Sequence, residues 1–133
     1  MTKRQYDDWR GRQRLTDAGW NVSKTDSIQF NAGSETFRHL VAKSAAAFYL
    51  KHDQGYRVDS EVTHPERGEI DILAWNADDI IAVECETAPT EEVITDKLER
   101  YYEGTPIRDV FVINVTEMPA EILPAYEWIV GEL

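Results

Sequence analysis

The stretch from residue 68 to residue 86 reads GEIDILAWNADDIIAVECE, and it decides the fold. Residues 69–75 and 80–86 are rich in isoleucine, valine and other apolar side chains, which is typical of strands. The residues between them, Asn76 to Asp79, are turn formers. We therefore predict a β-hairpin, in which residues that face each other have numbers that sum to about 155.

This hairpin would bring acidic side chains together. Side chains alternate between the two faces of a strand, so Asp71 would lie opposite Glu84, and Glu69 opposite Glu86. Like charges that face each other across a strand pair repel. A bound divalent cation is the commonest reason for such a pair, and Mg²⁺ takes one or two carboxylates together with water. We therefore expect a metal site at Asp71 and Glu84, with the backbone carbonyl of Cys85 as a further ligand.

The segments around the hairpin predict an α/β protein with a mixed central sheet flanked by helices. The predicted elements are a helix from Ser34 to Gly55, a strand over residues 56–62, a helix opened by Pro89 with Thr87 or Ala88 before it and Gly104 after it, a buried strand over residues 109–115, and a final helix from Pro119 to Val130. On strand 56–62 we expect Tyr56, Val58, Ser60 and Val62 to share one face, and on strand 69–75 we expect Ile70, Ile72 and Ala74 to do so.

Residues 1–32 are predicted to form an N-terminal arm with a short helix that ends near Gly19. Apolar residues in this arm are too sparse to define a buried helix face. Residues 33–133 are predicted to form a single domain, because a chain of 133 residues has room for one ordinary domain and little else.

Composition excludes several classes of protein. Hydrophobic residues make up 42% of the chain, which is enough for a core and argues against disorder. No apolar run approaches the roughly 18 residues of a membrane span, and the N-terminus lacks the apolar segment of a signal peptide. The one cysteine, Cys85, excludes an internal disulfide, and we expect it to be a packed core thiol. We expect a cytoplasmic, intracellular protein with no membrane partner.

The formal net charge of −11 is unevenly distributed. Residues 1–77 carry 11 acidic and 11 basic side chains, whereas residues 78–133 carry 14 acidic and 3 basic ones. This balance argues against binding to nucleic acid by bulk charge. The chain has five lysines and nine arginines, and an acidic, lysine-poor surface suits a halophilic protein. An ordinary acidic domain is the alternative interpretation.

The spacing of the acids resembles a known family. Asp71, twelve further residues and then Glu84-Cys85-Glu86 resemble the motif of the PD-(D/E)XK nuclease superfamily. Residues 68–74 look like the segment around the aspartate of archaeal Holliday-junction resolvases and related restriction-like nucleases.

The resemblance covers roughly residues 33–117 and includes the order of elements, which matches the restriction-endonuclease-like αβββαβ core. The arm and a C-terminal helix lie outside it. Glu35 resembles the acid that these proteins carry on the first core helix.

One position departs from the family, because Glu86 stands where the motif has lysine. Two ways to compensate for the missing motif lysine remain open. Glu86 would act as a base or as a second metal ligand, as in some restriction endonucleases, or Lys97 would replace the lysine from the following helix. Lys97 is the only lysine after residue 51. The alternative for Lys97 is an ordinary lysine on a helix surface.

The resemblance implies a metal-dependent endonuclease that hydrolyses DNA phosphodiester bonds, with structure-specific or junction cleavage among the options. Asp71 and Glu84 would hold Mg²⁺ or Mn²⁺, Glu86 would orient or deprotonate the attacking water, and Glu35 would join the cluster. Paired cuts at a junction would require a homodimer. The alternatives are a catalytically inactive restriction-like domain that binds nucleic acid or protein, and a small interaction protein with an acidic face.

DNA binding also requires positive charge. The candidate nucleic-acid-binding residues are Arg10, Arg12 and Arg14 in the arm together with Arg67, and Trp9 and Trp20 are candidates for stacking on bases. A solvated charged surface is the alternative interpretation.

Overall fold

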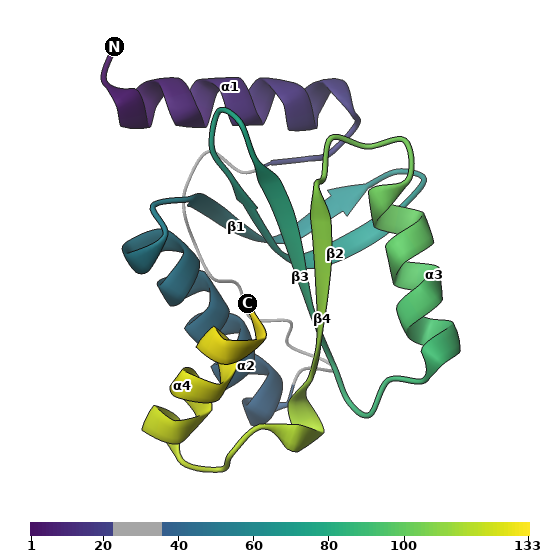
Figure 1. Ribbon diagram of the computed structural model, residues 1–133. Helices are drawn as coiled ribbons and strands as arrows, with labels where there is room; N and C mark the ends of the chain where they lie inside the picture. The colour runs from purple at the N-terminus through teal and green to yellow at the C-terminus, as the bar shows by residue number, and fades with distance from the viewer. Residues whose placement is uncertain (23–35) are drawn as a thin grey trace.

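The structure is a computed structural model that describes residues 1–22 and 36–133. Its elements in chain order are α1 (Lys3–Asp17), α2 (Phe37–Phe48), the π-helical turn η1 (Tyr49–Asp53), β1 (Arg57–His64), β2 (Gly68–Trp75), β3 (Ile80–Glu86), α3 (Glu91–Tyr102), β4 (Asp109–Asn114), the 3₁₀ turn η2 (Val115–Glu117) and α4 (Ile122–Glu132). The four strands form one sheet in the order β1-β2-β3-β4, in which β3 and β4 are parallel and the other pairs antiparallel (Figure 1). The predicted α/β fold with a mixed sheet flanked by helices is confirmed at this level.

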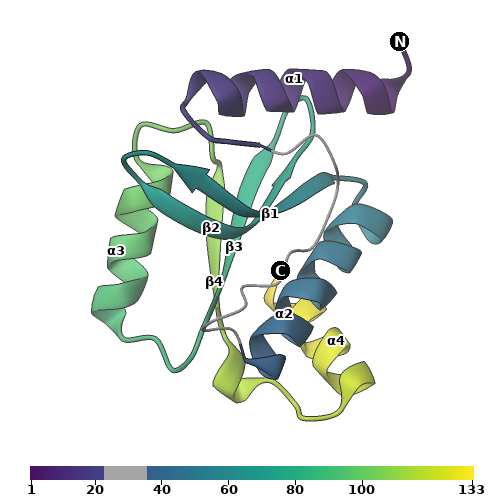
Figure 2. The same cartoon turned by 180° about the vertical axis from the view of Figure 1, so that it is seen from behind.

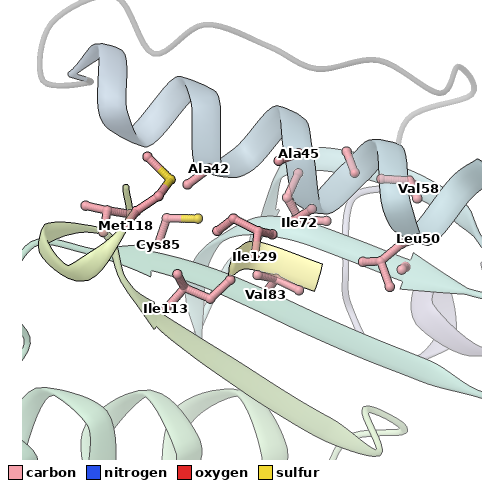
Figure 3. Close-up of a cluster of buried hydrophobic side chains, with 14 of the residues drawn as sticks. Ala42, Ala45, Leu50, Val58, Ile72, Val83, Cys85, Ile113, Met118 and Ile129 are labelled. Atoms are coloured by element: carbon pink, nitrogen blue, oxygen red, sulfur yellow. The ribbon is translucent and has the colours of Figure 1, made fainter. Parts of the chain in front are cut away.

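The sheet separates two hydrophobic clusters. The first lies beneath α2 and α4, which are neighbours on one side of the sheet (Figures 1 and 2). Figure 3 shows this cluster, with Cys85 packed among its side chains as a core thiol, as predicted. The second cluster involves α1 and α3 and includes Leu15, Trp75 and Tyr101. No helix among the described residues is long and apolar enough to cross a membrane.

The hairpin of β2 and β3 has the predicted register. Ile72 faces Val83, and Trp75 faces Ile80. The Asn76 side chain closes the turn, because its oxygen accepts hydrogen bonds from the backbone N–H groups of Asp78 (2.9 Å) and Asp79 (2.7 Å). Local sequence is sufficient for this prediction, since alternation and turn chemistry act within one short segment.

The outer hairpin of β1 and β2 differs from the prediction that each strand keeps one apolar face. Val58 and Ile72 belong to the first cluster, whereas their strand neighbours Val62 and Ile70 belong to the second. Between them, Glu61 has a φ of 52°, a left-handed conformation that non-glycine residues rarely adopt. This reversal redirects the β1 backbone, so simple alternation does not continue through it.

The N-terminal helix is longer than predicted and packs on the sheet. A capping box between Thr2 and Gln5 starts α1. Gly11 allows close contact with β2, since a Cβ at this position would lie 2.2 Å from Trp75 Cδ1. The helix also buries Leu15, which no apolar periodicity predicted. The proposed boundary between residues 32 and 33 lies outside the described residues.

Two helix starts differ from the prediction. The N-cap of α3 is Thr90, whose hydroxyl accepts a hydrogen bond from the Val93 backbone N–H (3.2 Å), so Pro89 precedes the helix. Gly104 follows the helix with a φ of 70°, as expected for a terminating glycine. The final helix begins at Ile122 rather than at Pro119. Ser34, the predicted start of the helix that contains α2, lies outside the described residues.

Candidate functional site

The candidate site lies where β2 and β3 stop pairing through their backbones. The register ends at Ile72 and Val83, and carboxylates then take the place of carbonyl acceptors. The Asp71 N–H donates to Glu84 Oε1 (3.2 Å), and the Cys85 N–H donates to Asp71 Oδ2 (2.8 Å). The structure therefore brings Asp71 and Glu84 together across the hairpin, as the register predicts.

Helix α3 contributes a lysine to this pair. Lys97 Nζ lies 3.1 Å from Glu84 Oε2 and 2.9 Å from Glu86 Oε1. The Lys97 side chain is 17% exposed, and its ammonium group lies 5.7 Å from the centre of the Tyr101 ring. Lys97 is therefore not an ordinary surface lysine, since it faces the sheet and bridges both glutamates of β3.

The acids of the site carry more negative charge than their surroundings stabilise. Burial raises the pKa of Glu84, and the charge of Asp71 raises it further, to about 8. Burial also raises the pKa of Asp71, although the hydrogen bond from the Cys85 N–H opposes this shift. Partial burial lowers the pKa of Lys97, but the charge of Glu84 and the hydrogen bonds to both glutamates outweigh it and raise that pKa. A further positive charge would therefore stabilise the site.

The ligands that this site offers a divalent metal are few. Among residues 1–22 and 36–133, no group of three or more histidine, cysteine or acidic side chains is arranged to hold a metal ion. Mg²⁺ needs only one or two carboxylates when water and a phosphate complete its shell. Asp71 and Glu84 meet this smaller requirement, since they lie together across the hairpin. Their hard carboxylate oxygens are the ligand type that Mg²⁺ and Mn²⁺ take.

The other predicted site residues have different positions. The Glu86 side chain is the more exposed of the two glutamates on β3, and it is bound to Lys97. Cys85 lies between them and contacts Asp71 through its N–H group. Glu35 lies outside the described residues.

Sequence reasoning missed two residues beside the site, Lys43 and Glu61, and named their neighbour Glu69 only as an acid expected to face Glu86. Lys43 of α2 is buried and forms an ion pair with Glu61 of β1, with Nζ 2.6 Å from Oε1. A side-chain hydrogen bond with Glu61, together with partial burial, raises the pKa of Glu69 to about 7. The only signal in the sequence for the burial of Lys43 is its position close to several alanines in a helix.

Two of the predicted nucleic-acid contacts are engaged inside the molecule. Arg12 donates to Asp8 (2.7 Å) and lies 5.1 Å from the centre of the Trp75 ring. Arg67 donates to the carbonyls of Arg100 and Glu103, each at 2.8 Å, near the end of α3. These arginines hold structural elements together.

The remaining candidates lie on or just after α1. Arg10 and Arg14 are half-buried on this helix, and Trp9 is exposed. Trp20 is buried in the second cluster and packs against the His64 ring, so the expectation that it stacks on bases is wrong.

Comparisons with models of known protein families, with curated proteins and with solved structures find no match. The fold and the site together define the class of protein. It is a mixed α/β protein in which two carboxylates, inserted between neighbouring strands, meet a lysine from the following helix.

Proposed function

We propose that this protein is a metal-dependent endonuclease that hydrolyses DNA phosphodiester bonds. The observation that supports this proposal best is the contact of Lys97 with Glu84 beside Asp71. It supplies, from α3, the positive charge that the PD-(D/E)XK motif carries at the position of Glu86. The restriction-endonuclease-like fold belongs to the same proposal.

Each residue has a chemical role in this proposal. Asp71 and Glu84 would hold Mg²⁺ or Mn²⁺, which when bound makes water more acidic and offsets charge on phosphate. Lys97 would move from one of its two carboxylates to a phosphate oxygen and stabilise the charge that develops there. Glu86 would accept the proton of the attacking water while the new P–O bond forms and the bond to the leaving deoxyribose oxygen breaks.

Net charge restricts where DNA would bind. The segment from residue 78 to residue 133 is strongly acidic and would repel phosphate outside the metal site. The neutral half, which includes α1, would therefore supply the contacts. Attraction to phosphate falls as salt rises, so a halophilic protein would depend more on shape, stacking and metal bridging. The proposal also includes a homodimer, which would make paired cuts. It includes an intracellular location, where the protein would meet cellular DNA.

Cleavage assays test the proposal directly. Linear, supercoiled and branched DNA are incubated with the protein and Mg²⁺ or Mn²⁺ at low and molar salt. We expect cleavage by the wild-type protein, and at least a hundredfold slower cleavage by Lys97→Met. Arg108→Met is the matched control, since the Arg108 side chain is 57% exposed and pairs with Asp79 at the turn, away from the proposed site. Failure to cleave every substrate, together with no Mn²⁺ binding, would refute the proposal.

A second candidate function is a catalytically inactive domain that binds nucleic acid or protein. The observation that favours it is the same ammonium group, because the ion pairs of Lys97 with Glu84 and Glu86 engage the groups that the nuclease would need for metal and phosphate. Calorimetry separates the candidates. Mn²⁺ binding that disappears in Asp71→Asn and Glu84→Gln supports the nuclease. DNA binding without any heat from Mn²⁺ supports the inactive domain.

A further inference from the structure

An ion pair that the proposed chemistry does not use lies beside the site. Lys43 comes from α2, on the side of the sheet opposite α3, and its side chain is 1% exposed. It contacts Glu61, whose side chain is 10% exposed, at 2.6 Å. Replacement of a buried ion pair by apolar residues is often neutral or stabilising. Stability alone therefore does not explain this pair.

Glu61 also has an unfavourable backbone conformation. Its φ of 52° lies inside β1, where a non-glycine residue in the left-handed region costs about 1–3 kcal/mol. Ser60 faces Ile72 and Val62 faces Ile70, so the strained residue occupies the β1 position opposite Asp71. On its other side, Asp71 uses its N–H for the Glu84 side chain instead of a β3 carbonyl. The strain therefore lies directly beside the carboxylate that leaves the regular ladder.

The pair and Lys97 reach this part of the hairpin from opposite sides of the sheet. Lys43 comes from α2, whereas Lys97 comes from α3 (Figures 1 and 2). Lys43 is too deeply buried to reach a DNA phosphate, so any effect on the reaction must pass through its neighbours.

We propose that Lys43 and Glu61 form a positioning pair for the metal-binding carboxylates, an inference that rests on the proposed nuclease function. The pair keeps β1 in the reversed conformation that accompanies the departure of Asp71 from the ladder. Neither residue touches metal or substrate.

The test is the double variant Lys43→Met/Glu61→Gly, which removes the buried charges together and relieves the left-handed strain. We expect its melting temperature to equal or exceed that of the wild-type protein. We expect its affinity for Mn²⁺, measured by calorimetry, to fall by about tenfold or more, because groups that orient metal ligands have effects of this size. The metal concentration for half-maximal cleavage should rise in parallel, with little change in the KM for DNA.

Two further variants control the result. Lys43→Arg keeps the charge and should retain most of the Mn²⁺ affinity. Lys3→Met/Asp7→Asn removes an ion pair of α1, whose Nζ–Oδ2 distance is 2.9 Å, and should leave the Mn²⁺ affinity unchanged. If the glycine variant does not fold, Lys43→Met/Glu61→Asn replaces it, since asparagine tolerates the left-handed region.

The possible failures are distinguishable. Wild-type Mn²⁺ affinity in a folded double variant would overturn the positioning role and leave the nuclease proposal intact. An equal loss of affinity in the α1 control would also overturn it. No Mn²⁺ binding by the wild-type protein would overturn both proposals.

Discussion

The hairpin of β2 and β3 has acidic residues at both ends, but the two ends differ in how the protein treats them. At the turn, Asp79 accepts hydrogen bonds from Arg108 and from the Tyr56 hydroxyl. Partial burial alone would raise the pKa of Asp79, but these donors outweigh it and lower that pKa. At the open end, burial raises the pKa of Glu84 to about 8.

The comparison shows that the environment, and not the residue type, distinguishes a structural acid from a candidate functional one. The turn acid is near solvent and pairs with Arg108, which also lies 4.0 Å from Asp109. The open-end acids are crowded, desolvated and share one lysine. Perturbed acids of the second kind are typical of functional sites. The nuclease proposal therefore assigns the divalent cation to the open end and not to the turn.

The largest expected effect is on cleavage. Asp71→Asn and Glu84→Gln should each reduce the cleavage rate by at least about a hundredfold, because each removes a proposed metal ligand. Asp79→Asn is the matched control at the turn and should stay within about twofold of wild type. Rates are measured under single-turnover conditions at a Mn²⁺ concentration that saturates the wild-type protein. An equal loss in all three variants would break the distinction between the two ends.

The next effect is on stability at the turn end, where α1 packs on β2. Gly11→Val should lower the free energy of unfolding by about 3 kcal/mol, since its Cβ would overlap Trp75. Denaturant titration measures this change. Gly131→Ala is the control, because nothing lies within 4 Å of that position, and it should be neutral or slightly stabilising. Folded Gly11→Val protein that had lost Mn²⁺ affinity would contradict the separation of the ends.

A smaller effect concerns the pH dependence of stability at the open end. The pKa of Glu84 rises from 4.5 to about 8 on folding, so the folded state binds the proton more tightly. Its contribution to stability therefore falls as pH rises between these values. As pH rises from 5 to 8.5, we expect the free energy of unfolding of Glu84→Gln to increase relative to that of the wild-type protein by on the order of 2 kcal/mol. Denaturant titrations measure this difference, and the same difference between variant and wild type at both pH values would contradict the raised pKa of Glu84.

The smallest effect has the opposite sign and belongs to the turn. The pKa of Asp79 is lowered on folding, so its stabilising contribution is present above the unfolded value of 3.8 and is lost in acid. Asp79→Asn should lower the free energy of unfolding by about 0.5–1 kcal/mol at pH 7, since Arg108 is mostly exposed. This difference should disappear as pH falls below 3.8. A stability difference between Asp79→Asn and wild type that grew in acid would contradict the lowered pKa of Asp79.

Local pattern predicted much of the fold. The bounds of β3, the register of its pairing with β2 and the position of Gly104 after α3 all follow from alternation and turn chemistry. The packing of α1 on Trp75 was not predictable, because it depends on a contact between Gly11 and a residue far along the chain. Pro89 predicts a start for α3 that is too early, because the hydroxyl that caps the helix belongs to Thr90.

The candidate site divides in the same way. Opposition of Asp71 and Glu84 follows from the hairpin register, which sequence predicts. The sequence does not predict that the Lys97 side chain points toward the sheet, because helical spacing indicates which residues share a face but not which face meets the sheet. Burial of Lys43 and the strain at Glu61 were also invisible, since both require α2 to pack against β1 and β2.

Sequence by itself thus determined the hairpin, its acid pair and the α/β order of elements, because these depend on side-chain alternation over short distances. Tertiary structure alone decided that Lys97 faces Glu84 and Glu86, and that Lys43 is buried against Glu61. The physical reason is that charge and burial depend on which surfaces meet. Only the packing of helices on the two sides of the sheet brings these lysines to the acids.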